Sequence, residues 1–283
     1  MQQMYTVVVE LEKLRVSPHT LGLLIPVAPD LDVQTCTGLR FIGQEHAKKV
    51  WDTTGTQQAW FLPSEWVRQL STIEYDFTLP TLLSKQSDAH FQVGEIEPWE
   101  NALGYNMASL GISEQQLCCE ETTIAKIVQY IGHKFQYISQ PSTGELGNLT
   151  CDLLTGNCID INQSLMALLS AAGIEHCYLS GVYSAQPQGL ASHGWHCWVA
   201  IRHANSTQYW DIAQHLKSGT TDIRPSLNPV GGVRFALAQG TNLQFLINHM
   251  CFSIPKLPLP TFIFNDGSSE LLIPDVTINN RTH

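Results

Sequence analysis

NCIDINQSLMALLSAAG, residues 157–173, is the stretch that decides the fold. Its apolar residues recur at the spacing of one helix face: Ile161, Leu165, Leu168, Leu169 and Ala172. Asn157 is a residue type that caps helix N-termini, and Gly173 is the usual stop at a C-terminus. The pattern therefore predicts a helix that starts directly after Asn157 and buries one face.

A second helix is predicted upstream, over TTIAKIVQYIGHKF. Its apolar residues follow the same period: Ile124, Ile127, Val128, Ile131 and Phe135. Ser113 and Gln116 form a possible capping box where the helical signal begins. Downstream of Gly173, three strand-like runs follow in order: EHCYLSGVY, WHCWVAIR and QYWDIA. The order helix, strand, strand, strand indicates an α+β domain with a helix packed on an antiparallel sheet.

The N-terminal part of the chain has a different pattern. Five short β-rich runs are separated by turn residues: TVVVELEKL, GLLIPV, GLRFIG, QQAWFL and STIEYDFTL. We predict a small all-β domain over residues 1–85, a linker over 86–112 and the α+β domain over 113–283. After Lys217 the chain is rich in proline and shows few clear elements, apart from a closing hairpin over TFIFNDGSSELLI, so this extension is expected to wrap the core.

Composition narrows the functional class. The 283 residues are enough for about two domains, and the formal net charge of −10 disfavours nucleic acid and anionic lipid as partners. No apolar run reaches the length of a membrane span, and no secretory signal is visible at the start of the sequence, so we expect a cytoplasmic protein. Eight scattered cysteines in such a chain favour reduced thiols.

Cys158 is the first candidate for chemistry. It would lie in the first turn of the predicted helix, where backbone N–H groups and the helix dipole favour a thiolate. Asp160 lies close by and would oppose that charge unless a cation compensates. Position alone favours a plain alternative, in which Cys158 is a small buried apolar residue.

A histidine could supply the compensating charge. His193 and His196 lie at the start of the WHCWVAIR strand. Successive side chains of a strand point to opposite faces, so His196 and Cys197 would face opposite sides of the sheet. With an even turn after this strand, Asp211 on the next strand would lie opposite or diagonal to His196 and could orient its ring. A register slip of one residue would remove that contact, and each residue alone is more often structural.

Together these segments resemble the core motifs of the transglutaminase-like superfamily, in particular its bacterial cysteine protease and amidase type. The motifs are GNCIDINQSLMALLSAAGI, HCWVAI and YWDIA, and the preceding KIVQYIGHKFQY resembles the helix before the family's cysteine. The resemblance covers about residues 122–216. It implies a papain-like α+β core, with an N-terminal β domain as a common companion, and it implies no cofactor.

The resemblance also implies roles for individual residues. Cys158 would be the nucleophile, His196 the general base and acid, and Asp211 the orienting acid. The backbone N–H of Cys158 would form one half of the oxyanion hole, and Trp195 or Gln136 the other. The chain departs from the family at Cys197, where a small residue is usual, and at Ile212 and Ala213, where Pro and Thr often follow the acid.

The implied function is acyl transfer from a peptide or protein amide through a thioester. Hydrolysis is favoured because water is always available, although transglutamination would use the same residues. The loop SAQPQGLASHG before the histidine strand could frame the cleft or be an ordinary solvent loop. A zinc site built from Cys151, Cys158, His193 and His196 is disfavoured by its spacing, so no metal is expected. The remaining alternative is a catalytically idle binding or scaffold module.

Overall fold

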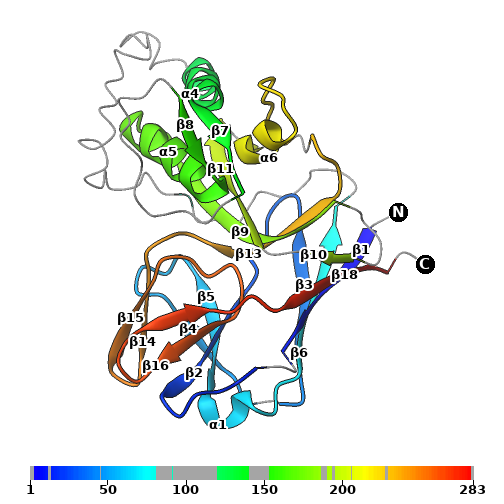
Figure 1. Cartoon of the computed structure of the whole chain (residues 1–283), viewed down its shortest axis with the longest axis vertical. Helices are drawn as coiled ribbons and strands as arrows, with labels where there is room; N and C mark the ends of the chain where they lie inside the picture. Colours follow the sequence, from blue (N-terminus) through cyan, green and yellow to red (C-terminus); the bar gives the residue numbers. More distant parts are fainter. Residues whose placement is uncertain are drawn as a thin grey trace. The chain divides into compact units, whose positions relative to one another are not determined.

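The computed structural model describes residues 3–11, 14–44, 46–80, 91, 120–139, 153–185, 190–192, 195–204, 206–226 and 229–281. It is a mixed α+β structure with more sheet than helix, which confirms the predicted fold class (Figure 1). Its contacts divide into two compact units. The first contains Met1–His90, Leu179–His196 and Gly232–His283, and the second contains Phe91–Tyr178 and Cys197–Gly231.

The first unit is built from β-sheets. One five-stranded sheet has the order β10-β18-β1-β6-β3, with β10 at Leu190–Ser192, β18 at Asp275–Asn280, β1 at Gln3–Glu10, β6 at Thr72–Leu79 and β3 at Thr35–Ile42. Alternate residues of β1 and β6 are buried because successive side chains of a strand point to opposite faces. They are Tyr5, Val7 and Val9 on β1, and Ile73, Tyr75 and Phe77 on β6.

A second five-stranded sheet has the order β17-β16-β2-β5-β4. Its strands are β17 at Ser269–Leu271, β16 at Thr261–Phe264, β2 at Thr20–Pro26, β5 at Gln58–Pro63 and β4 at Lys48–Trp51, and the short helix α1 at Ser64–Val67 follows β5. The hairpin of β14 at Leu243–Ile247 and β15 at Met250–Ile254 completes the unit, together with β13 at Val233–Gln239, which pairs with β9 at His176–Ser184.

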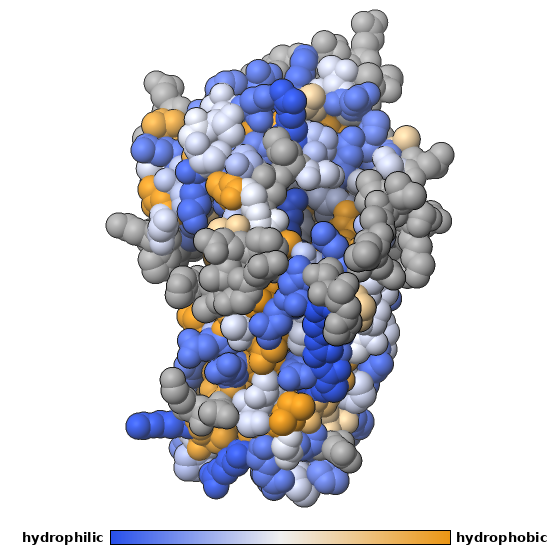
Figure 2. Space-filling view, turned by 90° about the vertical axis from the view of Figure 1, so that its right-hand side faces the viewer, coloured by the Kyte–Doolittle hydropathy of each residue, from blue (hydrophilic) through white to orange (hydrophobic). Residues whose placement is uncertain are grey.

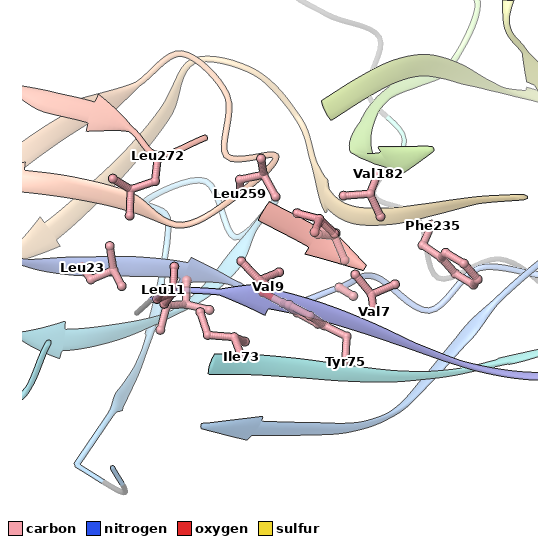
Figure 3. Packing of buried hydrophobic residues seen from close by; sticks show 14 of the residues in the cluster. Val7, Val9, Leu11, Leu23, Ile73, Tyr75, Val182, Phe235, Leu259 and Leu272 are labelled. Atoms are coloured by element: carbon pink, nitrogen blue, oxygen red, sulfur yellow. The ribbon is translucent and has the colours of Figure 1, made fainter. Parts of the chain in front are cut away.

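Inner-face residues of both five-stranded sheets form one hydrophobic cluster. Val7, Val9, Ile73 and Tyr75 of the first sheet belong to the same cluster as Leu23 of β2; Figure 3 shows Leu23 at one end of the view, beside Leu11, and Val7 toward the other end. This arrangement resembles a β-sandwich core, in which the two inner faces exclude water from each other.

The C-terminal segment is more ordered than its sequence suggested. The expected hairpin is confirmed by the pairing of β16 with β17, but the segment after Lys217 contains six strands, β13 to β18, where few elements were expected. The last strand, β18, pairs antiparallel with β1. The compact units therefore differ from the continuous domains expected over 1–85 and 113–283, because strands from both ends of the chain share sheets. The linker expected over 86–112 lies outside the described residues, except for Phe91.

The second unit contains the predicted helices. These are α4 at Glu120–Lys134 and α5 at Cys158–Ala171, followed later by α6 at Ile212–Lys217. Its strands are β7 at Phe135–Tyr137, β8 at Leu154–Gly156 and β12 at Ser206–Trp210, together with the part of β11 (Trp195–His203) that follows His196. The predicted helix faces form the core of this unit, and they include Ile124, Ile127, Val128, Ile131, Ile161, Leu165, Leu168 and Leu169. Val199 and Ile201 of β11 join the same cluster. The capping box expected at Ser113 lies outside the described residues.

The surface mixes polar and apolar side chains. Figure 2 shows one face on which separate hydrophobic residues lie among hydrophilic ones. Large exposed apolar residues include Trp51, Leu246 and Ile273, and single residues of this kind are normal on protein surfaces. None of the helices in the described ranges has the length and hydropathy needed to cross a membrane.

Candidate active site

The start of α5 positions Cys158. Asn157 caps the helix: its side-chain oxygen accepts hydrogen bonds from the backbone N–H of Ile159 at 2.8 Å and of Asp160 at 3.4 Å. The Asp160 carboxylate accepts the backbone N–H of Asn157 at 3.0 Å and so completes a capping box. Cys158 is therefore in the first turn of the helix, as predicted, and its side chain is half-buried. Asp160 serves as a cap at this helix start.

Just before α5, the backbone at Gly156 packs closely against the side chains of Asp160 and Phe135. Strand β8 pairs in parallel with β7, and Gly156 pairs with Tyr137. A Cβ atom on Gly156 would lie 2.9 Å from Cβ of Asp160 and 3.1 Å from the ring of Phe135. Glycine is therefore required at this position for close packing rather than for an unusual φ.

A second thiol, that of Cys197 on β11, lies beside the first turns of α5. The pKa of Cys197 is raised well above its usual value, first by burial and then by a hydrogen bond with Cys158. The side-chain amide of Asn162 donates to the backbone oxygen of Cys197 at 2.9 Å and to its sulfur at 3.3 Å. Burial raises the pKa of the nearby Tyr178 phenol well above its usual value, and the negative charge of Cys197 raises it further. Asn162, one helical turn after Cys158, therefore ties Cys197 of β11 to this end of α5.

Tyr137 links the thiols to the predicted acid. Burial raises the pKa of the Tyr137 phenol, and the negative charges of Cys158, Cys197 and Asp211 raise it further. All three groups are therefore within electrostatic range of one phenol. Cys158 and Asp211 both lie in the second unit, and the charges of both act on this phenol.

Asp211 occupies a different element from the one expected. It follows Trp210, the last residue of β12, and caps the unexpected short helix α6. Its carboxylate, which is 1% exposed, accepts the backbone N–H of Gln214 at 3.2 Å. The backbone oxygen of Asp211 lies 2.8 Å from Nδ1 of His215, so His215 donates there and accepts the N–H of Arg224 at Nε2. The acid is therefore fixed by its own helix.

His196 belongs to the first unit and directly precedes Cys197 on β11. Its ring is buried, and its centroid is 6.0 Å from that of Tyr183. Trp195 is half-buried, with Nζ of Lys256 5.4 Å from its ring centroid. Gln136 is exposed on β7, and its neighbour Tyr137 is the residue near the thiols.

Several residues that the sequence analysis singled out lie outside the described residues. Cys151 and His193 of the disfavoured zinc site are two of them. In the loop expected at SAQPQGLASHG, Leu190–Ser192 forms strand β10 and pairs with β18, whereas Gln186–Gly189 lies outside the described residues. Over the part of the chain that is described, no group of three His, Cys, Asp or Glu residues has the arrangement of a metal site.

Sequence reasoning did not identify three residues around the thiols: Tyr137, Asn162 and Tyr178. One signal was available for Asn162, because it lies four residues after Cys158 and so shares its helix face. A polar residue on a face that must be buried needs a hydrogen-bonding partner. No comparable local signal pointed to the two tyrosines.

Comparison with known proteins supports the resemblance seen in the sequence. Residues 114–211 match the family model described as the transglutaminase-like superfamily. No curated protein matches the chain. Among solved structures, one described as "a putative cysteine protease" from Cytophaga hutchinsonii is 12% identical, with a TM-score of 0.42, and the match covers 99% of this chain and 98% of that one.

The periplasmic domain of TgpA from Pseudomonas aeruginosa is 14% identical, with a TM-score of 0.34, and the match covers 76% of this chain and 92% of that one. The same domain bound to ethylmercury is 13% identical, with a TM-score of 0.37, and the match covers 76% of this chain and 91% of that one. The family match spans the cysteine helix, the histidine strand and the acid. Residues 114–211 therefore carry a transglutaminase-like core, as the sequence motifs predicted.

Proposed function

We propose that this protein is a cysteine enzyme that cleaves peptide or side-chain amides through a thioester, with Cys158, His196 and Asp211 as its triad. The observation that carries the proposal is the position of Cys158, which is half-buried in the first turn of a capped helix. Backbone N–H groups and the helix dipole at that position stabilise a thiolate.

Two further observations support the roles of the partners. His196 opens the HCWVAI motif, which lies inside the range that the family model matches, and the residue is buried. Asp211 is buried, and its charge acts on the same phenol, Tyr137, as the charge of Cys158 does. A buried carboxylate can hold an imidazole in one tautomer and stabilise its charged form.

The proposed reaction has two steps. The Cys158 thiolate attacks the amide carbon, and the backbone N–H of Cys158 stabilises the oxyanion, with Trp195 or Gln136 as a second donor. His196 then protonates the departing amine, and the thioester remains. Water attacks the thioester and gives its proton to His196, which releases the carboxylic acid and restores the thiolate. An amine in place of water would give transamidation; we propose hydrolysis because it needs no second binding site.

The test is the pH dependence of iodoacetamide labelling at each cysteine, in the wild type and in His196→Ala. No Lys or Arg lies between Lys134 and Arg202, so trypsin leaves four cysteines on one peptide; cleavage before Asp152 and Asp160 isolates Cys158 instead. Cys36 is an internal reference, because burial raises its pKa to about 11 and it should stay unlabelled near neutral pH.

We expect Cys158 to label rapidly below about pH 7, and His196→Ala to slow this labelling about tenfold or more. His203→Ala, on the same strand, is the matched control and should change nothing. Slow labelling of Cys158 in the wild type, with the titration of an ordinary thiol, would favour the scaffold alternative.

Asp211→Asn tests the acid separately from its cap. The amide oxygen of Asn can still accept the N–H of Gln214, so α6 keeps its cap while the charge is lost. Amide hydrolysis should fall by about 10²- to 10⁴-fold with little change in melting temperature. An Asp211→Asn variant with full activity would remove Asp211 from the triad.

A further inference from the structure

We propose that a cavity in the first unit is a binding site for a short peptide with free termini and an apolar side chain. The cavity has a volume of about 460 Å³, which is within the range of ligand pockets. Its walls come from β2, from β4, from the segment where β5 passes into α1, and from the turns of the β14–β15 and β16–β17 hairpins (Figure 1). All of these elements belong to the first unit, and none of the lining residues belongs to the proposed triad.

One part of the cavity lining is apolar. Phe61 and Ile247 are buried there, and Val50 is half-buried. Leu246, next to the β14–β15 turn, lines the same cavity and is 62% exposed. An apolar side chain of a ligand that covered Leu246 would remove apolar surface from water, which favours binding.

A buried polar group of the lining lacks a partner. Thr20 lines the cavity and is 3% exposed, and its hydroxyl forms no hydrogen bond with any described residue. Buried hydroxyls without a partner are uncommon in folded proteins because they cost free energy. A ligand that brings an N–H or C=O group into the cavity can supply the missing hydrogen bond.

Opposite charges line the cavity on two different elements. Lys48 lies on β4 and Glu65 on α1, and both residues are exposed. Among the residues that the structure describes, neither has an ion-pair partner, so the two charges do not neutralise each other. A peptide with free termini carries the complementary pair, a carboxylate for Lys48 and an ammonium group for Glu65.

Two asparagines add groups that match a peptide bond. Asn248 and Asn265 line the cavity from the two hairpin turns, and each side-chain amide has donors and an acceptor, as a peptide group does. The φ angles of Asn248 and His249 are 50° and 65°, which is typical of a two-residue type I′ turn and fixes the position of Asn248. A purely apolar ligand would leave the charges and amides unused, and a simple anion would leave Glu65 unused.

The experiment measures binding of leucyl-leucine to the whole chain by isothermal titration calorimetry. Cys158→Ala is titrated beside the wild type, so that cleavage of the peptide by the proposed enzyme is not mistaken for binding. We expect Lys48→Gln and Glu65→Gln each to weaken binding about tenfold, because each removes a charge-assisted contact with one terminus. Affinity that is unchanged in both variants would place the peptide elsewhere and overturn the proposal.

Lys49→Gln and Glu270→Gln are the matched controls. Lys49 follows Lys48 on β4, Glu270 is exposed on β17, and neither residue lines the cavity. Each control removes the same charge from the same unit, so the affinity for leucyl-leucine should stay at the wild-type value. A loss as large as in Lys48→Gln or Glu65→Gln would mean that only the net charge of the unit matters.

Peptides with one blocked terminus assign each charge. N-acetyl-leucyl-leucine has no ammonium group, so it should bind the wild type about tenfold more weakly than leucyl-leucine, and Glu65→Gln should weaken it no further. Leucyl-leucinamide has no terminal carboxylate, and the same relation should hold for Lys48→Gln. Blocked peptides that remain fully sensitive to these substitutions would show that the termini do not face Lys48 and Glu65.

Thr20→Val separates binding from folding. Valine keeps a similar shape and removes the hydroxyl, so affinity should fall about threefold, while the melting temperature stays the same or rises because that hydroxyl has no partner in the protein. A lower melting temperature with unchanged affinity would instead give Thr20 a structural role and contradict its part in binding.

Glycylglycine tests the apolar part of the cavity, because it has both free termini and no side chains. Its affinity should be at least about tenfold lower than that of leucyl-leucine. Equal affinity of the two peptides, or no heat of binding with leucyl-leucine at millimolar concentration, would overturn the proposed site. Labelling of Cys158 is a separate measurement, so the peptide site and the proposed enzyme can each fail while the other stands.

Discussion

Asn162, one helical turn after Cys158, donates to the Cys197 sulfur at 3.3 Å, so we expect the two thiols to lie close together, and this proximity is directly testable. Diamide removes one hydrogen atom from each of two adjacent thiols, is itself reduced to the hydrazine, and leaves a disulfide. We expect brief diamide treatment of the native protein to join the peptide that contains Cys158 to the one that contains Cys197, and a reducing agent to reverse the link. Peptide mapping by mass spectrometry measures this.

Cys177→Ala should form the same crosslink, and Cys197→Ala should form none. A native protein in which Cys158 instead pairs with Cys177 would show that the expected proximity of Cys158 and Cys197 is wrong.

Whether the sequence could predict a feature of this site depends on how far apart in sequence the interacting residues lie. The position of Cys158 was predictable because a helix cap is local: Asn157 and Asp160 lie within three residues of each other. Strand alternation also placed Cys197 on the face of Val199. The partners of Cys197 were not predictable, since Asn162 is 35 residues away from it in sequence and the contact depends on how α5 packs on β11.

His176 should make stability depend on pH. Burial lowers its pKa, and the hydrogen bond from Nδ1 to the backbone oxygen of Ile174 at 2.9 Å offsets only part of that effect. The folded protein therefore binds a proton at this histidine less readily than the unfolded chain does, so the free energy of unfolding should fall as pH drops below about 6.5.

His176→Asn keeps a donor near the Nδ1 position and removes the titration. Urea unfolding at about pH 7.5 and pH 5.5 should show a smaller loss of stability in this variant than in the wild type. His133→Asn, on the exposed side of α4, should keep the wild-type dependence. An equal loss in His176→Asn and the wild type would assign the pH effect to other groups.

The start of α5 depends on the absence of a side chain at Gly156. A methyl group there would come within 2.9 Å of Asp160, which closes the capping box, and within 3.1 Å of Phe135. Overpacking of this kind costs about 1–3 kcal/mol, so Gly156→Ala should lower the free energy of unfolding by that amount. Chemical denaturation measures the change.

Thr155→Ala is the control for Gly156→Ala, because Thr155 is exposed on the same strand and should change stability by less than about 0.5 kcal/mol. Equal stability of Gly156→Ala and the wild type would mean that the β8 to α5 connection can shift at little cost.

Helices whose apolar residues recur at a regular spacing were predictable from the sequence. Short elements without such a spacing, including strands that are recognised only by their pairing with other strands, were not. Helices α4 and α5 carry apolar residues at helical spacing on faces that are buried, so the pattern and the structure agree. Helix α6 was missed because its six residues are too few to show a period, and Asp211 was assigned to the strand before it. The strands after Lys217 were hidden by short length and frequent proline.

Across the whole chain, contacts between distant segments hold the first unit together. The side chain of Gln34, 2% exposed, donates to the backbone oxygen of Ala236 at 2.9 Å and accepts the backbone N–H of the same residue at 2.9 Å. It also donates to the oxygen of Pro29. Gln34 thereby satisfies the backbone of β13 where its pairing with β9 shifts register. Sequence patterns do not reveal a hydrogen bond between two residues that are 202 positions apart.

Replacing this glutamine should destabilise the first unit even when its volume is kept. Gln34→Met fills a similar space but leaves the N–H and the oxygen of Ala236 without their partner. An unpaired buried polar group costs about 1–3 kcal/mol, so we expect the free energy of unfolding to fall by roughly 2 kcal/mol or more.

Gln244→Met is the control, since Gln244 is exposed on β14 and should tolerate the same change. The Gln34 hydrogen bonds lie in the first unit. Gln34→Met should therefore change the midpoint of unfolding, followed near Trp60, more than it changes the rate at which Cys158 is labelled at neutral pH. A Gln34→Met variant as stable as the wild type would mean that water or a local rearrangement replaces these bonds, and that strand pairing alone keeps the N-terminal and C-terminal segments of this unit together.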